Sequence, residues 1–267
     1  MADTPIDTSV AHTARVWNYW LGGTDNYPAD REVGDAIREL MPQIVEVARG
    51  DRGFLRRVVT HLVREEGVRQ FLDIGAGLPT AGNTHEVARA HAPEARVVYV
   101  DNDPSVLAHA RRLLGDTDGG RTRFVGADLR DTGAVLSSAR RTLDLDRPVA
   151  LTLLGTLGHI GDAEEAMGVV RAYMDALAPG SFLAVCDGVY ADMEDIADER
   201  TARALRHWRE AVAQPYHMRS VGEFGRFFDG LELAEPGIVS VTRWRPEPDD
   251  AVPLVDVPQY CGLARKL

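Results

Sequence analysis

Short apolar runs alternate with helix-like segments between residues 70 and 186, and this alternation constrains the fold more than any other feature. The runs expected as strands are 70–74, 96–100, 123–126, 149–154 and 181–186. The segments expected as the helices between them are 84–91, 103–114, 133–143 and 162–178. Strands and helices that alternate at this spacing form parallel βαβ units in one open sheet. We therefore expect an α/β fold with a doubly wound, mostly parallel sheet.

The chain before this sheet is expected to be helical. Segments with helical periodicity are 8–21, 29–40 and 51–66. Gly22 and Gly23 are expected to end the first of them. On this pattern residues 1–50 form an N-terminal helical cap, and residues 51–267 form one compact domain.

The tail of the chain departs from the alternation. The elements expected there are helices at 191–213 and 220–228 and strands at 231–234 and 238–244. A short turn at 235–237 joins the two strands, which is typical of a hairpin. Such a hairpin would close the parallel sheet with an antiparallel edge.

The chain carries 41 Asp and Glu against 30 Lys and Arg, a net charge of −11. So acidic a surface repels polyphosphate, and we do not expect nucleic acid as a partner. No window approaches 18 uninterrupted apolar residues, and no basic region followed by an apolar run opens the chain. We therefore expect no membrane span and no secretory signal, and hence a cytoplasmic protein. The oligomeric state is not predicted.

The metal-binding residue types show no metal-site spacing. The eight histidines are scattered, without a His-x-x-x-His pair on a helix. Cys186 and Cys261 do not form a Cys-x-x-Cys pair, and both are expected to be buried, reduced thiols. No metal site is expected.

A glycine-rich turn, DIGAGLPT over residues 73–80, follows the first expected strand and precedes a helix. Glycine lets the backbone turn tightly and lets a ligand approach it closely. In dinucleotide-binding folds a third glycine follows, and the helix N-terminus faces a pyrophosphate, but here Thr80 stands in that place after Pro79. Asp73 adds a negative charge, which repels phosphate but suits the ammonium and sulfonium groups of S-adenosylmethionine (SAM). The turn is therefore expected to bind SAM.

Two further carboxylates follow neighbouring strands. Asp101 ends the second expected strand, where a carboxylate can accept both ribose hydroxyls. Asp128 follows the third, where it can accept an adenine amino group while Leu129 offers apolar contact. Each acid alone is commonly a surface residue. Three acids at the ends of successive strands, together with the glycines, indicate one pocket.

Three segments carry a resemblance to a known family: RVWNYWLGGTDNY at 15–27, DIGAGLPT at 73–80 and VDNDP at 100–104. Over roughly residues 54–245 the chain resembles the class I SAM-dependent methyltransferases. Over nearly its whole length it looks like an actinobacterial family of such methyltransferases, of unassigned function, with an N-terminal Gly-Gly-x-Asp-Asn segment. The resemblance implies a Rossmann-like, seven-stranded sheet with an antiparallel last strand.

The resemblance also implies which residues contact the cofactor. Expected at the methionine part are Asp73, Gly75 and Gly77, at the ribose Asp101, and at the adenine Asp128 and Leu129. The neighbouring Ala76 and Asn102 are expected to contact SAM as well.

A polar face of the first helix invites two interpretations. Arg15, Asn18 and Tyr19 share this face, and Asn26 follows in the loop after the glycines. In one interpretation the face folds over the cofactor, with Arg15 or Asn18 meeting its carboxylate and Tyr19 shielding its sulfonium. In the other, the helix is simply docked by its two tryptophans.

Methyl transfer from SAM is an in-line displacement that needs no covalent catalyst. The protein must hold the acceptor atom about 3 Å from the methyl group and exclude water. His159, after the fourth expected strand, is a candidate base or acceptor-orienting residue, or simply a hydrogen-bonded turn residue. Candidates for the acceptor pocket, which could equally be packing or surface residues, are Thr156, Tyr190, Tyr216 and Arg219.

The expected function is SAM-dependent methylation of a small molecule. One alternative is a SAM-binding sensor or regulator without turnover, whose binding residues would be identical. The other is an NAD-dependent oxidoreductase. Asp73, Thr80 and the lack of a Tyr-x-x-x-Lys pair speak against NAD.

Overall fold

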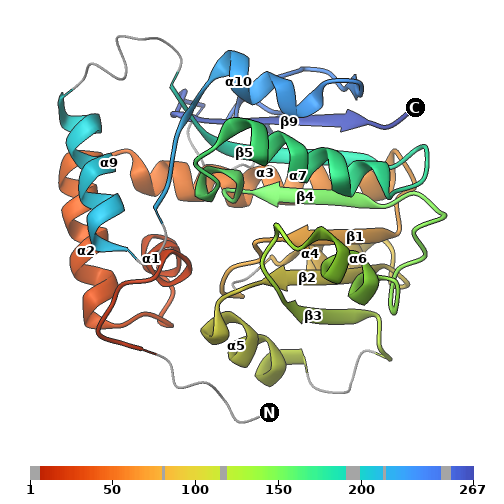
Figure 1. The fold of residues 1–267 in the computed structure, drawn as a ribbon, viewed down its shortest axis with the longest axis horizontal. Helices are drawn as coiled ribbons and strands as arrows, with labels where there is room; N and C mark the ends of the chain where they lie inside the picture. The colour runs from red at the N-terminus through yellow and green to blue at the C-terminus, as the bar shows by residue number, and fades with distance from the viewer. Residues whose placement is uncertain (1–6, 80–81, 115–118, 191–198, 213–214, 248–253) are drawn as a thin grey trace.

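A mostly parallel sheet runs through the centre of the molecule, with strands in the order β3-β2-β1-β4-β5-β9-β7 (Figure 1). The computed structural model describes residues 7–79, 82–114, 119–190, 199–212, 215–247 and 254–267. The parallel strands are β1 (Gln70–Ile74), β2 (Arg96–Asp101), β3 (Thr122–Gly126), β4 (Ala150–Leu154) and β5 (Phe182–Tyr190). They confirm the strands expected from the apolar runs, and with them the α/β fold.

Helices cover both faces of this sheet. They are α3 (Ile44–Arg64), α4 (Thr84–His91), α5 (Pro104–Leu114), α6 (Thr132–Ala139) and α7 (Ala163–Asp175). Along β1, Leu72 packs into the apolar cluster of α6 and α7, and its neighbour Phe71 packs into that of α3 and α4. Successive side chains of a strand point to opposite faces, so both faces are buried, as a doubly wound sheet requires. None of the described helices is both long enough and apolar enough to span a bilayer.

Side-chain caps set where several helices begin. The Asp162 carboxylate accepts the Glu165 amide at 2.8 Å at the start of α7. Ser220 and Glu223 form a reciprocal capping box at the start of α10 (Val221–Gly225). The Asp-x-x-Glu and Ser-x-x-Glu spacing of these residues is typical of such caps.

The antiparallel edge of the sheet differs from the expected hairpin. Strand β9 (Gln259–Arg265), which the sequence did not indicate, pairs antiparallel with β5. The two segments expected to pair with each other shorten to β7 (Glu232–Leu233) and β8 (Val239–Ser240), and each pairs with β9 instead. The hairpin was therefore wrong, although the edge is antiparallel as expected.

The strand expected at 238–244 ends early because its backbone finds another partner. Arg57 of α3 donates to the carbonyl oxygens of Val241 (2.6 Å) and Trp244 (2.7 Å). Trp244 is fully buried, with its ring 5.2 Å from that of Phe54. A buried guanidinium thus satisfies carbonyls that a β-ladder would otherwise pair.

Three helices stand beside the carboxyl end of β4: α1 (Thr13–Trp20), α2 (Pro28–Leu40) and α9 (Glu199–Ala211) (Figure 1). Trp20 of α1 lies 5.7 Å from Trp17 and 5.5 Å from Trp208 of α9, measured between ring centroids. Helix α3 runs unbroken across residues 50 and 51, and the division into a cap and a domain at that point stays a prediction. Residues 191–198 and 213 of the expected helix 191–213 lie outside the described residues.

Candidate functional site

The glycine turn after β1 has a backbone that only glycine adopts readily. Gly75 and Gly77 have φ values of 75° and 62°, in the left-handed region. The amide of Gly75 donates to the Val100 carbonyl at 2.8 Å, which ties the turn to β2. A Cβ on Gly75 would overlap the Thr156 hydroxyl, whereas a Cβ on Gly77 would meet nothing within 4 Å. The turn is thus packed against Thr156 at Gly75, whereas its backbone at Gly77 has open space beside it. Thr80 lies outside the described residues.

Asp73 is buried at the end of β1 and joins three elements. It accepts hydrogen bonds from the hydroxyls of Thr84 (2.6 Å) and Thr152 (2.7 Å), which belong to α4 and β4. Burial raises the pKa of Asp73, and the two hydroxyl hydrogen bonds oppose that shift. The carboxylate therefore both lines the pocket and fixes the strand ends around it.

Asp101 ends β2 and faces the glycine turn. Its Oδ2 accepts the Gly77 amide and its Oδ1 the Asp103 amide, each at 2.9 Å. Burial raises the pKa of Asp101, and these two hydrogen bonds lower it. Each oxygen has taken one backbone N–H and can accept a second donor. Two neighbouring hydroxyls of a ribose match that pair of acceptors.

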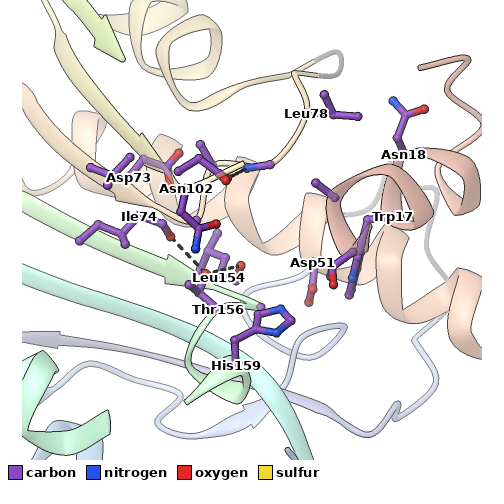
Figure 2. A pocket seen from close by; sticks show the side chains of 18 of the residues that line it. Trp17, Asn18, Asp51, Asp73, Ile74, Leu78, Asn102, Leu154, Thr156 and His159 are labelled. Carbon is purple, nitrogen blue, oxygen red and sulfur yellow. Dashed lines mark hydrogen bonds between the residues drawn. The ribbon is translucent and has the colours of Figure 1, made fainter. Parts of the chain in front are cut away.

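The pocket lies where the ends of β1, β2 and β4 face α1 and α3. In Figure 2, Trp17, Asn18 and Asp51 stand across it from Asp73, Asn102 and Thr156. Sequence-predicted residues that line it are Asn18, Asp73, Gly75, Ala76, Gly77, Asp101, Asn102, Leu129, Thr156 and His159. Thr156 also donates to the Ile74 carbonyl at 3.1 Å, which holds the β4 end against the β1 end. The structure thus brings predicted residues of α1, the glycine turn and the ends of β2 and β4 together in one pocket.

Asp128 and Leu129 are placed differently from each other. Leu129 lines the pocket, and its carbonyl accepts the Tyr173 hydroxyl at 2.8 Å. The Asp128 side chain is 43% exposed and accepts from the Arg130 amide (2.8 Å) and guanidinium (3.1 Å). It is not among the residues that line the pocket.

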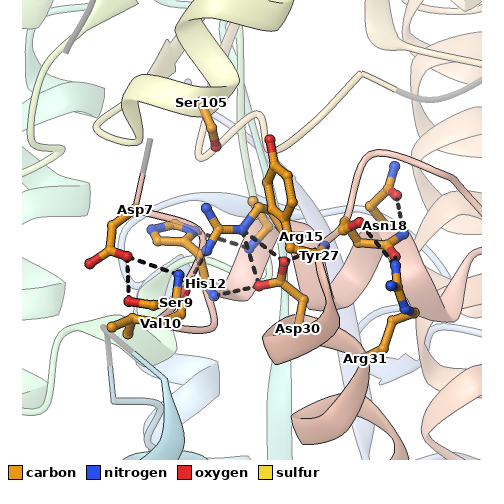
Figure 3. Close-up of polar contacts among 12 residues, drawn as sticks. Asp7, Ser9, Val10, His12, Arg15, Asn18, Tyr27, Asp30, Arg31 and Ser105 are labelled. Carbon is orange, nitrogen blue, oxygen red and sulfur yellow. Dashed lines mark hydrogen bonds and ion pairs between the residues drawn. The ribbon is translucent and has the colours of Figure 1, made fainter. Parts of the chain in front are cut away.

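The polar face expected on the first helix is divided. The Arg15 guanidinium pairs with Asp30 at 3.0 Å, donates to the Val10 carbonyl and lies over the Tyr27 ring (Figure 3). The Tyr19 hydroxyl donates to Asp35 at 2.8 Å. Both side chains therefore join α1 to α2 and its entry, and neither lines the pocket.

Asn18 lies on the pocket side of α1. Its Oδ1 accepts from Asn26 Nδ2 at 2.9 Å, and Asn26 Nδ2 also donates to the Gly23 carbonyl at 2.9 Å. Asn26 is not a lining residue, but it fixes the Asn18 amide. With its oxygen so occupied, Asn18 has N–H donors for the pocket.

Two polar lining residues of the N-terminal segment, His12 and Thr13, were not predicted from the sequence. His12 Nδ1 lies 2.9 Å from Asp103 Oδ2, a polar contact that ties the segment before α1 to the loop after β2. Thr13 is buried, and among the described residues its hydroxyl has no hydrogen-bond partner. A buried unsatisfied hydroxyl in a pocket is what a ligand acceptor would complete.

His159 lies in the turn after β4, in the short helix Leu157–His159. Its Nδ1 lies 2.9 Å from the Pro215 carbonyl, which can only accept, so Nδ1 carries the proton and Nε2 has the lone pair. Burial lowers the pKa of His159, which favours the neutral form of the ring. In Figure 2 the ring stands at the pocket wall.

None of the three tail candidates lines the cofactor pocket, and two of them, Arg219 and Tyr216, support the turn that holds His159. Arg219 donates to the carbonyls of Leu157 and Ile160 on either side of His159. The Tyr216 hydroxyl donates to Asp187, and its ring is 5.3 Å from the His159 ring. Tyr190 lies further off, with its hydroxyl 3.5 Å from Glu223.

Asp51 of α3 is the main lining residue that the sequence analysis passed over. It accepts from Cys186 Sγ (2.7 Å) and Gln259 Nε2 (3.0 Å). Burial raises its pKa to about 7, and the nearby Asp187 adds to the shift. The only signal in the sequence was an acid next to the apolar positions of α3, at 54 and 55. Among the described residues no group of three or more His, Cys, Asp or Glu could hold a metal ion.

Comparisons with known proteins agree with this geometry. A family model described as S-adenosyl methyltransferase matches residues 1–267. The chain is 43% identical to a DUF574 family protein from Streptomyces avermitilis, with a TM-score of 0.90 over 98% of this chain and 100% of that one. It is 39% identical to a candidate methyltransferase from Thermobifida fusca, with a TM-score of 0.87 over 97% and 96% of the two chains. No curated protein matches the chain.

More distant structures show the fold alone. An O-methyltransferase family 2 protein from Planctomyces limnophilus has a TM-score of 0.51 at 16% identity, over 94% of this chain and 65% of that one.

The Streptomyces and Thermobifida sources of the two similar structures fit an actinobacterial family. The chain belongs to the S-adenosyl methyltransferase family and is a SAM-dependent methyltransferase.

Proposed function

We propose that this methyltransferase acts on a small-molecule acceptor, which it methylates by in-line displacement inside a pocket closed by α1. One observation carries the proposal: Trp17 and Asn18 of α1 stand across the pocket from Asp73 and Asn102, at the ends of β1 and β2 (Figure 2). An acceptor that reaches the cofactor must fit under this helix. The net charge of −11 disfavours nucleic acid for the same role.

The residues present fit SAM. Asp101 has an acceptor position left on each carboxylate oxygen for the ribose hydroxyls, and the backbone at Gly77 is open to a ligand. The Thr13 hydroxyl, which has no partner in the part of the chain that the structure describes, and the Asn18 amide are the proposed partners of the methionine carboxylate. Leu129 is proposed to flank the adenine. Asp128 is left out of this set because its carboxylate is paired with Arg130.

When bound, SAM supplies an electrophilic methyl group on a cationic sulfur. The protein's tasks are to align the acceptor atom, exclude water and remove a proton where the acceptor carries one. His159 is the proposed proton acceptor, because its Nδ1–H is held by the Pro215 carbonyl and its Nε2 is unprotonated. Arg219 keeps that turn in place.

Calorimetry with SAM, its demethylated product and NAD tests the cofactor site. We expect saturable binding of the first two and none of NAD, and binding of NAD in preference to SAM would overturn the assignment. Incubation with methyl-labelled SAM and the small-molecule fraction of a cell extract tests turnover. Label recovered only in protein or nucleic acid would refute the small-molecule proposal, and no transfer at all would favour the sensor alternative.

A further inference from the structure

A second pocket, lined mainly by apolar and aromatic side chains, lies beside the cofactor pocket. Residues of α1, α3, α9 and the C-terminal part of α2 line it, together with Gly188 of β5. The aromatic and sulfur-containing side chains that line it are Trp17, Trp20, Met41, Trp208, Tyr216 and Met218. None of its described lining residues carries a charge. Such a pocket suits a neutral, largely apolar molecule, because a charged one would lose its hydration without a counter-charge.

The second pocket adjoins the cofactor pocket at three places. Trp17 lines both. Asp51 of the cofactor pocket accepts from Gln259 of the second pocket at 3.0 Å. The ring of His159, in the cofactor pocket, lies 5.3 Å from the ring of Tyr216, in the second pocket. A molecule seated in the second pocket therefore lies next to the residues that face the proposed site of methyl transfer.

One polar group in the second pocket lacks a partner. Trp208 is only 7% exposed, and within the described residues its indole N–H makes no hydrogen bond. Leaving a buried donor unpaired costs about 1–3 kcal/mol in general, so native structures seldom retain one without a reason. A ligand that carries a carbonyl or ether oxygen would supply the missing acceptor.

We propose that the second pocket binds the body of the methyl acceptor, and that this acceptor is a neutral aromatic molecule with a hydrogen-bond acceptor for Trp208. The inference rests on the proposed function, since it assigns a substrate class to the same site. Trp17 then separates the acceptor body from the cofactor, and the reactive atom of the acceptor reaches past it toward His159.

The test uses 2-acetylnaphthalene, which is neutral and has one carbonyl, and 2-naphthalenesulfonate, its anionic counterpart. Binding of each is followed by quenching of tryptophan emission, because three of the four tryptophans line the pocket. SAM affinity is measured on the same samples by calorimetry. We expect saturable binding of the neutral probe at about one site, and binding of the sulfonate at least about tenfold weaker.

Two variants test whether the neutral probe binds in the second pocket. Ala204 is buried on α9 and lines the pocket, so Ala204→Phe fills it; the matched control, Arg206→Phe, adds the same ring on the exposed face of α9. Ala204→Phe should weaken binding of the neutral probe at least about tenfold and leave the affinity for SAM within about twofold of wild type. Trp208→Phe keeps an aromatic ring but removes the N–H. It should weaken binding of the neutral probe, 2-acetylnaphthalene, several-fold without unfolding the protein.

The outcomes separate the two proposals. If the wild type binds SAM but shows no saturable binding of the neutral probe, the inference fails and the proposed cofactor site stands. Equal probe affinity in Ala204→Phe, Trp208→Phe and wild type would also overturn it. If SAM itself does not bind to the wild type, the proposed function fails, whatever the probe does.

Discussion

The backbone amide of Gly77 donates to Asp101 Oδ2 at 2.9 Å, so the glycine turn after β1 and the acid at the end of β2 form one unit. The turn cannot move without losing this bond, and the carboxylate cannot rotate away from the pocket while it holds the turn. Asp73 anchors the other side of the turn through Thr84 and Thr152. The cofactor pocket is therefore shaped before any ligand arrives, which limits the ordering that binding requires.

Replacing Asp101 with Asn should weaken SAM binding by about 10- to 100-fold, equivalent to about 1.4–2.7 kcal/mol. The amide keeps the size of the carboxylate but replaces one of the two acceptors with a donor. Calorimetry with SAM measures the effect. Asp128→Asn is the matched control, since that carboxylate is paired with Arg130 outside the pocket, and its SAM affinity should stay within about threefold. Equal losses in both variants would contradict the assigned roles.

Gly75→Ala should destabilise the fold by about 1–3 kcal/mol. The new Cβ would overlap the Thr156 hydroxyl, and alanine rarely adopts a φ of 75°. Urea denaturation measures the free energy of unfolding. Gly168→Ala is the control: this glycine lies exposed in α7 with nothing near its missing Cβ, and the change should stabilise the protein by about 0.5–1 kcal/mol. A Gly75→Ala protein as stable as wild type would show that Thr156 moves aside freely.

The parts of the molecule that the sequence predicted are those encoded locally. Strand β1 runs directly into its glycine turn, and β2 runs directly into its terminal acid, so in each case neighbouring residue types carry the signal. The Asp162 and Ser220 helix caps are local for the same reason. Strand β9 is different: its central Gly262 weakens the strand pattern, yet glycine is needed there because a Cβ would press on the Phe228 ring.

The unpredicted parts of the site depend on contacts between distant segments. Asp51 acquires its setting from Cys186 and Gln259, which lie 135 and 208 residues further along the chain. Helical spacing places Arg15 and Tyr19 near Asn18, but α2 packs on α1 and takes the first two side chains as its partners. Helical periodicity predicts which residues share one face of a helix, but it does not predict which neighbouring element packs against each of them.

Asp51 should make stability depend on pH. Burial raises its pKa to about 7 in the folded protein, against about 3.9 in an unfolded chain, so the folded state binds this proton more tightly. Its contribution to the free energy of unfolding is therefore fully present below about pH 4 and is lost as the pH rises toward 7. Asp51→Asn, which imitates the protonated acid, should gain about 1–3 kcal/mol relative to wild type on going from pH 5 to pH 8. Urea titrations at both pH values measure it, and parallel curves for the two proteins would refute the shift.

His159→Gln should lower the rate of methyl transfer by about 10²- to 10⁴-fold for an acceptor that loses a proton, because Nε2 is the proposed proton acceptor. SAM affinity should change little. The wild-type rate should rise with pH through a pKa below the usual 6.5 of histidine, since burial lowers it, and this rise should be absent in the variant. Turnover of labelled SAM from pH 4.5 to 8 measures both. A histidine that serves only the turn would leave the shape of the pH profile unchanged when replaced.

Arg15 and Asn18, three residues apart on α1, should affect different properties. Arg15→Met leaves the fully buried Asp30 without its guanidinium partner, and should destabilise the protein by about 3–5 kcal/mol. Asn18→Ala removes an amide that lines the pocket, and should weaken SAM binding by about 5- to 20-fold with a smaller loss of stability. Asn26→Ala tests how Asn18 is positioned, because it removes the donor to Asn18 Oδ1 while the Asn18 amide itself stays in place, and it should reproduce part of the binding loss. If Arg15→Met instead kept its stability and lost SAM, the guanidinium would be acting on the cofactor, as the first interpretation of that helix face held.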